Sequence, residues 1–477
     1  MPFLIETPFG FSLDLSLWQE IFSWPTVEII NAIIAMIGWA ILALVFFNMG
    51  EHLWVKYREA KYKHPWKWVL LAVDIPPLFV QSPKAVEQIF AHFSGALIGP
   101  NVIEKYWMGR KQKFFSLEIV SIEGYIQFLI RTEEEFRDLV EAAIYAQYPE
   151  AEITEVEDYV DNVPTHYPND SYDVFGGEFA LEKADAFPIR TYKHFEYSLS
   201  KDVVFSDPMA AILENFTRIG HGENFWMQII IEPCDNHWKE KGIALVKEIV
   251  ENKGETGGHG HHGGGFFISL LTGIPSMLFK LAQQIWDWNF EAGEGAAHAE
   301  PSPLGRVMDL TPGSKGVVEA IEEKISKVGF KSKVRVLYIA RKEVYNPSRC
   351  FDGFVGAINQ FNVQSSNALV PYKITKLHYA FKLMRLGWRK SSFVSVFKKR
   401  KIKFWGKPYV LNIEELATLW HFPLPFVKAP MLQKATTKKG EAPINLPTEM
   451  LESPIRRKVV EPPLPPPPAP PEELPYA

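Results

Sequence analysis

The feature that most constrains this chain is an apolar run near its start. Residues 29–49 read IINAIIAMIGWAILALVFFNM and include no charged side chain. A run of this length is about what a helix needs to cross the hydrocarbon core of a bilayer. The run therefore predicts a single transmembrane helix at residues 29–49.

The charges on either side of the run predict its orientation. Residues 1–28 hold four acidic residues and no Lys or Arg, whereas five basic residues lie between positions 56 and 67. Basic residues favour the cytoplasmic side of a membrane. We therefore expect a single-pass protein of the cell membrane, with residues 1–28 outside the cell and the bulk of the chain in the cytoplasm.

Net charge and cysteine content exclude some classes of protein. The formal net charge is -5, so any affinity for nucleic acid must come from a local cluster of basic residues. The two cysteines, Cys234 and Cys350, lie far apart in the sequence. They do not form a disulfide framework, and they fit a reducing compartment.

Residues 66–160 show a regular alternation of strand and helix patterns. The order βαββαβ predicts a ferredoxin-like module, in which two helices cover one face of an antiparallel sheet. The expected strands are Trp68–Pro76, the two runs on either side of Glu123-Gly124 and Ala151–Tyr159, and the expected helices are Pro83–Phe93 and Glu133–Gln147.

A similar order recurs over residues 187–376 and predicts a second ferredoxin-like module of the same α+β class. An insertion, residues 235–311, interrupts it. The expected strands are Arg190–Leu199, Asn224–Pro233, Lys333–Arg341 and Ala368–Ile374, and the expected helices are Pro208–Phe216 and Ser348–Phe361.

The insertion has three parts of different character. Residues 238–250 and 314–328 predict helices that pair as arms on either side of it. The stretch ETGGHGHHGGG predicts a solvated linker rather than a metal site, because glycines surround its histidines and no cysteine lies nearby. Within residues 266–290 the uncharged run ends at Lys280 and is interrupted by Pro275, so it is too short to span a bilayer. Two interpretations of this segment stay open: a helix that packs on protein, or a helix at a membrane interface. In the second case the interface residues are Phe266, Phe267, Leu270, Leu271, Trp286 and Trp288.

Motifs for catalysis are missing from the sequence. We find no phosphate-binding loop of the form G-x-x-x-x-G-K-[ST], no G-x-S-x-G, no H-E-x-x-H and no paired C-x-x-C. We therefore expect a protein that is not an enzyme and that uses no cofactor and no metal.

The region from 373 to 407 is the strongest charge cluster. It holds twelve Lys or Arg and no Asp or Glu, and aromatic residues lie among the basic ones. Nucleic acid, an anionic lipid surface and an ordinary solvated face all fit this composition. The candidate polyanion-binding residues are Lys382, Arg385, Arg389, Lys390, Lys398, Lys399, Arg400, Lys401 and Lys403.

A short helix follows, in the sequence LNIEELATLWHFP at residues 411–423. Asn412 and Glu415 have the spacing of a capping box, and Leu416 and Trp420 share one apolar face. The stripe predicts a helix that packs either on its own core or on a partner. Residues 377–428 would complete the folded part, and the proline-rich residues 429–477 predict a disordered, extended tail.

The helix sequence, followed by APINLP at residues 442–447, resembles a signature of a bacterial family. SPKAVEQIFAHFSG at 82–95 and DPMAAILENF at 207–216 are similar to the same family. The family that these segments resemble is the membrane-anchored, non-ATPase N-terminal region of conjugative DNA-transfer or type IV secretion-like proteins. Those proteins are associated with HerA/FtsK-class, TraD-like motor ATPases. The resemblance covers about residues 30–450.

The resemblance implies a membrane-tethered cytoplasmic scaffold that couples the membrane to a separately encoded motor ATPase, with DNA and further copies of the chain as other partners. No motor domain follows the signature, so ATPase activity is not implied. The alternative is a membrane-surface adaptor that binds anionic lipid through its basic and amphipathic segments and has no role with nucleic acid. The residues implied to contact the motor are Asn412, Glu415, Leu416, Leu419, Trp420 and Phe422.

Overall fold

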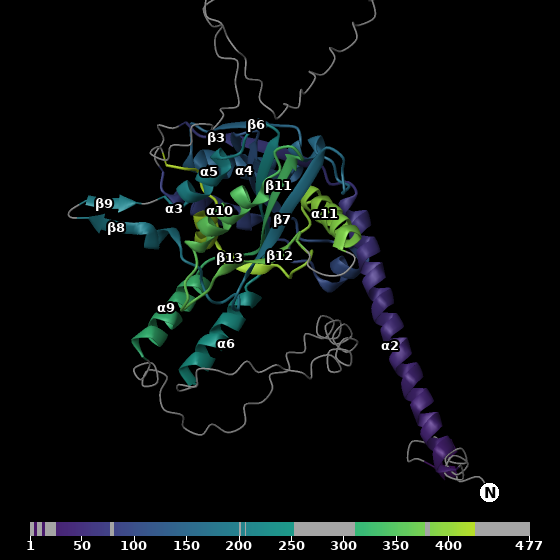
Figure 1. Cartoon of the computed structure of the whole chain (residues 1–477). Helices are drawn as coiled ribbons and strands as arrows, with labels where there is room; N and C mark the ends of the chain where they lie inside the picture. The colour runs from purple at the N-terminus through teal and green to yellow at the C-terminus, as the bar shows by residue number, and fades with distance from the viewer. Residues whose placement is uncertain are drawn as a thin grey trace, which may run out of the picture. The chain divides into compact units, whose positions relative to one another are not determined.

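The computed structural model describes residues 4–6, 12–14, 25–76, 81–199, 202–205, 207–251, 311–376 and 382–424. The chain divides into two compact units. We call them the helical unit, which holds residues up to Pro65 together with Pro100–Lys111, and the sheet unit, which holds the other described residues (Figure 1).

The helical unit is built on one long helix, α2 (Thr26–Lys63). A short π-helix, Glu104–Met108, packs on α2, where the indole nitrogen of Trp54 donates to the carbonyl of Tyr106 at 2.8 Å. Two three-residue strands, β1 (Leu4–Glu6) and β2 (Ser12–Asp14), pair antiparallel.

The predicted transmembrane helix at residues 29–49 is wrong. The apolar run is only the first part of α2, which continues past Met49 into a charged stretch that holds Glu51, Lys56 and Arg58. Among the residues that the structure describes, none of the helices combines the length and the apolar character needed to cross a membrane.

The sheet unit is organised around one nine-stranded sheet in which every pairing is antiparallel. The strand order along the sheet is β12 (Leu369–Ile374), β7 (Tyr172–Leu181), β11 (Gly329–Arg341), β10 (Glu223–Pro233), β4 (Phe115–Ile122), β5 (Tyr125–Glu133), β3 (Trp68–Asp74) and β6 (Glu152–Glu155). The ninth strand, β13 (Tyr409–Asn412), pairs with the start of β11.

The prediction of two ferredoxin-like modules is wrong, because the two halves share one sheet. Strands β4 and β10 would be the exposed edges of separate modules, but they pair with each other over eight residues, from Asn224 opposite Ile122 to Ile231 opposite Phe115. Pairing removes two unsatisfied strand edges at once. A single hydrophobic core then runs under both halves.

The prediction that Arg190–Leu199 forms the first strand of the second module is also wrong. Residues 192–195 form a 3-10 turn, and β8 (Glu196–Leu199) pairs with β9 (Asp202–Phe205) in a separate hairpin. The place beside β11 is taken by β7. That strand contains Gly176 and Gly177, and an added Cβ on Gly176 would come within 2.6 Å of the Phe393 ring.

Five helices pack against one face of the sheet and share its main core: α3 (Pro83–Phe93), α4 (Arg137–Gln147), α5 (Met209–Thr217), α10 (Pro347–Asn359) and α12 (Ile413–Leu419). Their inward faces are rich in aromatic rings. Phe90, Phe128 and Trp420 meet there, with ring centroids about 6 Å apart. Three more short 3-10 turns are Ser94–Ala96, Glu134–Phe136 and Tyr159–Asn162.

The opposite face of the sheet is covered by α11 (Lys382–Lys398) and by the segment after β6. Phe393 and Phe397 of α11 pack there on Trp226 and Leu337 of the central strands. The helix approaches its neighbours closely at Gly387, where an added Cβ would lie 2.9 Å from the carbonyl of Tyr167.

Two further helices, α6 (His237–Glu251) and α9 (Pro312–Ser326), lie side by side and project from the sheet unit (Figure 1). They are the two arms predicted around the insertion. Residues 252–310, which include the histidines and the candidate interface residues Phe266 to Trp288, lie outside the described residues, as do residues 425–477.

Candidate polyanion-binding surface

The signature helix α12 forms as its sequence predicts. Asn412 accepts a hydrogen bond from the backbone of Glu415 at 2.8 Å, and the Glu415 carboxylate accepts one from the backbone of Asn412 at 3.0 Å. Leu416, Leu419 and Trp420 are fully buried against the core. Of the two interpretations of the apolar stripe, the structure shows a helix that packs on its own core. Phe422 is 5% exposed, so the residues expected to contact a motor ATPase are not available at the surface.

The signature also ties the arm α9 to the core. The Glu415 carboxylate lies 3.0 Å from the ammonium of Lys324, and both side chains are fully buried. The other Glu415 oxygen accepts from the backbone of Ile189 at 2.9 Å. Glu415 is therefore a structural residue at the base of α9.

Arg400, a candidate polyanion-binding residue, is buried in an ion cluster. Its guanidinium donates to Glu118 at 2.9 and 3.1 Å and to Asp158 at 2.9 Å. Burial alone would raise the pKa of Glu118, but Arg400 and the hydroxyls of Ser116 and Tyr159 outweigh it and lower that pKa. Arg400 thus anchors the C-terminal end of α11 and is not accessible to a ligand.

The other basic candidates divide by exposure. Lys390 pairs with Asp173, and Lys398 donates to the carbonyl of Val163 at 2.6 Å. Both are therefore engaged in the fold. The Lys382 side chain lies outside the described residues, whereas Lys399, Lys401, Lys403 and Arg385 are exposed and Arg389 is half-buried.

A second buried ion cluster holds the loop at residues 401–407. Glu178 on β7 accepts from Arg335 at 2.8 Å and from Lys333 at 3.3 Å. Lys333 then donates to the carbonyl of Gly406 at 2.8 Å, and Arg335 donates to the carbonyl of Lys401. The backbone of this loop is thus held by two side chains of β11. Sequence reasoning missed the cluster, although two basic residues alternating with valines in a buried strand signal a hidden acidic partner.

The exposed side of α11 forms a shallow hollow of about 450 Å³, which we call the α11 hollow. The described residues that line it include three cations and no acid: Lys373, Met384, Arg385, Trp388, Arg389 and Trp405. Met384 and Trp388 are 78% and 74% exposed, which makes them the most exposed large hydrophobic side chains in the described part of the sheet unit.

The two tryptophans of the α11 hollow differ in their surroundings. Trp405 stacks on Phe393 and Phe404, at 4.9 and 5.1 Å between centroids, and Arg389 lies 4.8 Å from the Trp405 ring. These contacts hold the Trp405 ring in place at the side of the hollow. Trp388 makes no ring or cation contact with any other described residue, and its side chain is exposed.

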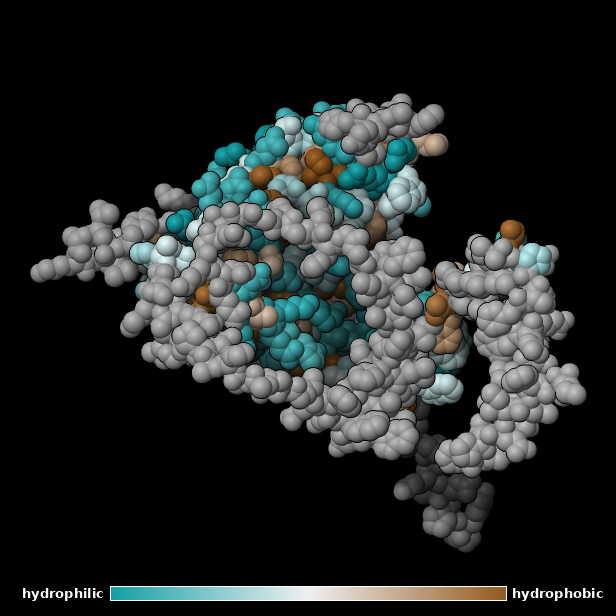
Figure 2. Space-filling view, turned by 90° about the horizontal axis from the view of Figure 1, so that it is seen from below, coloured by the Kyte–Doolittle hydropathy of each residue, from teal (hydrophilic) through white to brown (hydrophobic). Residues whose placement is uncertain are grey.

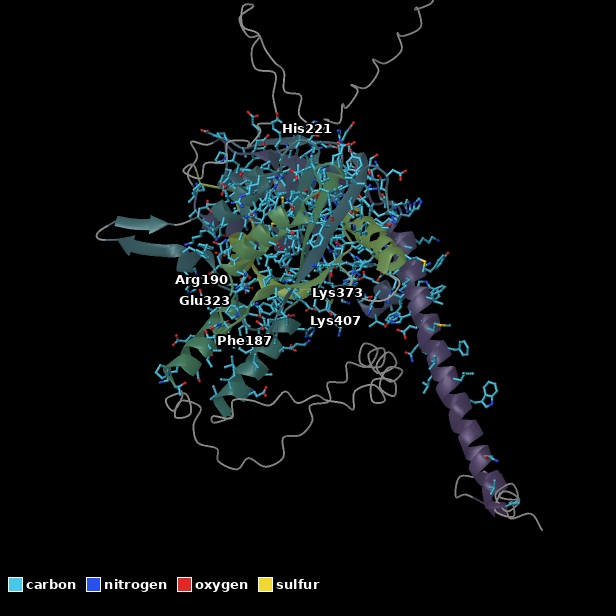
Figure 3. The ribbon with its side chains drawn as sticks, viewed as in Figure 1. Phe187, Arg190, His221, Glu323, Lys373 and Lys407 are labelled. Carbon is cyan, nitrogen blue, oxygen red and sulfur yellow. The ribbon has the colours of Figure 1, made fainter. Side chains whose placement is uncertain are left out.

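The edge strand β12 borders the α11 hollow. Gly406 lies against Tyr372, where an added Cβ would come within 3.2 Å of the ring. In the view of Figure 3, Lys373 and Lys407 are on the lower side of the sheet unit, and His221 is at its top. The described residues on the face seen in Figure 2 are mostly hydrophilic, with hydrophobic ones scattered among them.

No metal or thiolate chemistry emerges from the described residues. Within that part of the chain, no three His, Cys, Asp or Glu side chains are grouped so that they could hold a metal ion. Burial raises the pKa of both cysteines, that of Cys234 to about 11, so these thiols stay protonated at neutral pH.

The comparisons with known proteins give one match. Neither the curated proteins nor the solved structures provide a match to this chain. The model of a family described as a domain of unknown function matches residues 101–433. The matched region includes β4, the junction with β10, all of α11 and the signature helix α12. Because it spans well over half of the chain, the protein belongs to the DUF8128 family.

Proposed function

We propose that this protein is a scaffold that binds single-stranded DNA at the α11 hollow, within a conjugative DNA-transfer or type IV secretion-like system. The observation that carries the proposal is the exposed Trp388 between Arg385 and Arg389, in a hollow whose described lining holds no acidic side chain.

The chemistry of the α11 hollow suits a single strand. Lys and Arg release counterions from phosphates, and an exposed indole stacks on any base because every base has a π-face. The hollow is also preorganised, since Arg400 and Lys333 fix the helix and the loop that frame it. A ligand therefore needs to order few protein groups on binding.

The place in a DNA-transfer system is supported by the resemblance of the signature segments. The motor ATPase partner rests on that resemblance alone and stays a prediction. We do not assign its contact to α12, because the apolar face of α12 is buried in the core.

The experiment is fluorescence anisotropy with a labelled oligothymidine of about 12 nucleotides, within the usual range of single-strand sites. Trp388→Ala should weaken binding by about 1–3 kcal/mol, the usual loss for one stacked base. Arg385→Glu combined with Arg389→Glu should lower the slope of log K against log salt by about 0.7 for each lost phosphate contact.

Matched variants control for exposure and charge. Trp107 is 67% exposed in the helical unit, and Lys342 is exposed on the sheet unit, so Trp107→Ala and Lys342→Glu should leave DNA binding unchanged. Vesicles that contain phosphatidylserine test the alternative. If Trp388→Ala weakens binding to vesicles but not to DNA, the proposal fails and the lipid adaptor replaces it.

A further inference from the structure

We propose that the bound strand extends beyond the α11 hollow, across the loop at residues 401–407, into a second and larger hollow. This inference rests on the proposed function and adds the length and path of its ligand. The second hollow has a volume of about 1230 Å³ and lies between α6, the start of β11 and that loop. We call it the α6 hollow.

The two hollows share a wall. Trp405 lines both of them, and its ring is held by Phe393 and Phe404. The loop that carries Trp405 cannot shift easily, because Lys333 and Glu178 bind its backbone at Gly406. A strand that leaves the α11 hollow over Trp405 therefore enters the α6 hollow without meeting a mobile barrier.

The loop presents charge along this path. Lys403 and Lys407 are exposed, both line the α6 hollow, and neither forms an ion pair with another described residue. Lys333 and Glu178 bind the loop backbone from the side of the sheet, and the side chains of Lys403 and Lys407 face solvent. They are placed to contact successive phosphates between the two hollows.

The α6 hollow also offers surfaces for bases. Trp238, Phe404 and Leu245 contribute aromatic and apolar lining. The acidic residues of its lining come from outside the loop. Asp235 lies just before α6, Glu248 lies in α6, and Asp185 lies after β7. This arrangement directs phosphates to the loop side and bases toward the apolar lining.

The test compares oligothymidines of about 6 and about 16 nucleotides, which lie within the range of single-strand sites. In the unaltered protein, the longer strand should bind at least about tenfold more tightly, because it adds phosphate contacts at the loop. The variant Lys403→Glu with Lys407→Glu should lose this gain for the longer strand and leave the shorter one unchanged. Lys342→Glu serves as the charge control.

The outcomes separate the two proposals. If Arg385→Glu with Arg389→Glu weakens both strands, while the loop variant binds both as the unaltered protein does, the extended path is wrong and the α11 hollow stands. If the loop variant weakens both strands equally, Lys403 and Lys407 contact the first few nucleotides and the extended path is again wrong. If neither variant changes binding of either strand, both proposals are wrong. Circular dichroism of each variant confirms that the fold is retained.

Discussion

Arg400 shows how one residue in a basic run can have a structural role unlike that of its neighbours. Its backbone has a φ of +47°, a conformation that is uncommon for residues other than glycine. Contacts with Glu118 and Asp158 compensate for this strain. Nothing in the local sequence KKRK distinguishes Arg400, because its partners lie more than two hundred residues earlier.

Replacing Arg400 should therefore reduce stability rather than binding alone. Arg400→Met leaves the buried Glu118 carboxylate without its charged partner, and we expect the free energy of unfolding to fall by about 3–5 kcal/mol. Urea denaturation measures this change. Arg385→Met makes the same chemical change on the exposed side of α11 and should alter stability by less than about 0.5 kcal/mol. Equal losses in the two variants would show that the ion cluster does not stabilise the fold.

At the scale of elements, the sequence predicts structures whose partners lie within a few residues, but not pairings between distant segments. The capping box of α12 is predicted by Asn412 and Glu415, because both partners lie within one turn. The strand β7 was missed because Gly176, Gly177 and Glu178 interrupt its apolar pattern, and Glu178 finds its partners on β11. Trp388 is one of the aromatic residues within the basic run, but the sequence does not show that it is exposed, because exposure depends on which face of α11 packs on the sheet.

The end of α12 should also carry a pH dependence. Asp207 lies before α5, and its carboxylate accepts from His421 at 2.9 Å and from the backbone of Leu424 at 2.9 Å. Burial opposes the charged form, yet His421 and the backbone donors lower the pKa of Asp207 below its ordinary 3.8. Stabilisation by Asp207 is therefore complete above about pH 3.8 and is lost as the pH falls through the lower, folded-state pKa.

This dependence can be measured by thermal unfolding between about pH 2 and pH 6. Asp207→Asn should lower the melting temperature near pH 6 and reduce the further loss on acidification, because the group that titrates has been removed. Asp352→Asn alters an exposed carboxylate on α10 and should keep the acid dependence of the unaltered protein. An unchanged acid profile in Asp207→Asn would assign the loss to other carboxylates.

At the scale of the whole sheet unit, the junction of β4 and β10 joins the two halves of the sheet. The two halves share eight paired residues and one hydrophobic core. Sequence patterns locate most of these strands but not their register across the junction, because strand pairing depends on contacts between segments about one hundred residues apart.

We therefore expect both halves of the sheet to unfold in one transition. Amides of β5 and of β11, which lie on either side of the junction, should exchange with the same opening free energy at low denaturant. Met227→Ala removes a fully buried side chain on β10 and should lower both values by about 2–5 kcal/mol. A loss confined to β11 would instead mean that each half unfolds independently.

The bound loop at residues 401–407 has a kinetic consequence. Because Lys333 and Arg335 hold its backbone, the positive field of Lys403 and Lys407 has a fixed direction on a protein whose formal net charge is -5. In the proposed complex with single-stranded DNA, this field would orient the strand before contact. We therefore expect added salt to slow the encounter steeply and the indole of Trp388 to set most of the lifetime of the proposed complex.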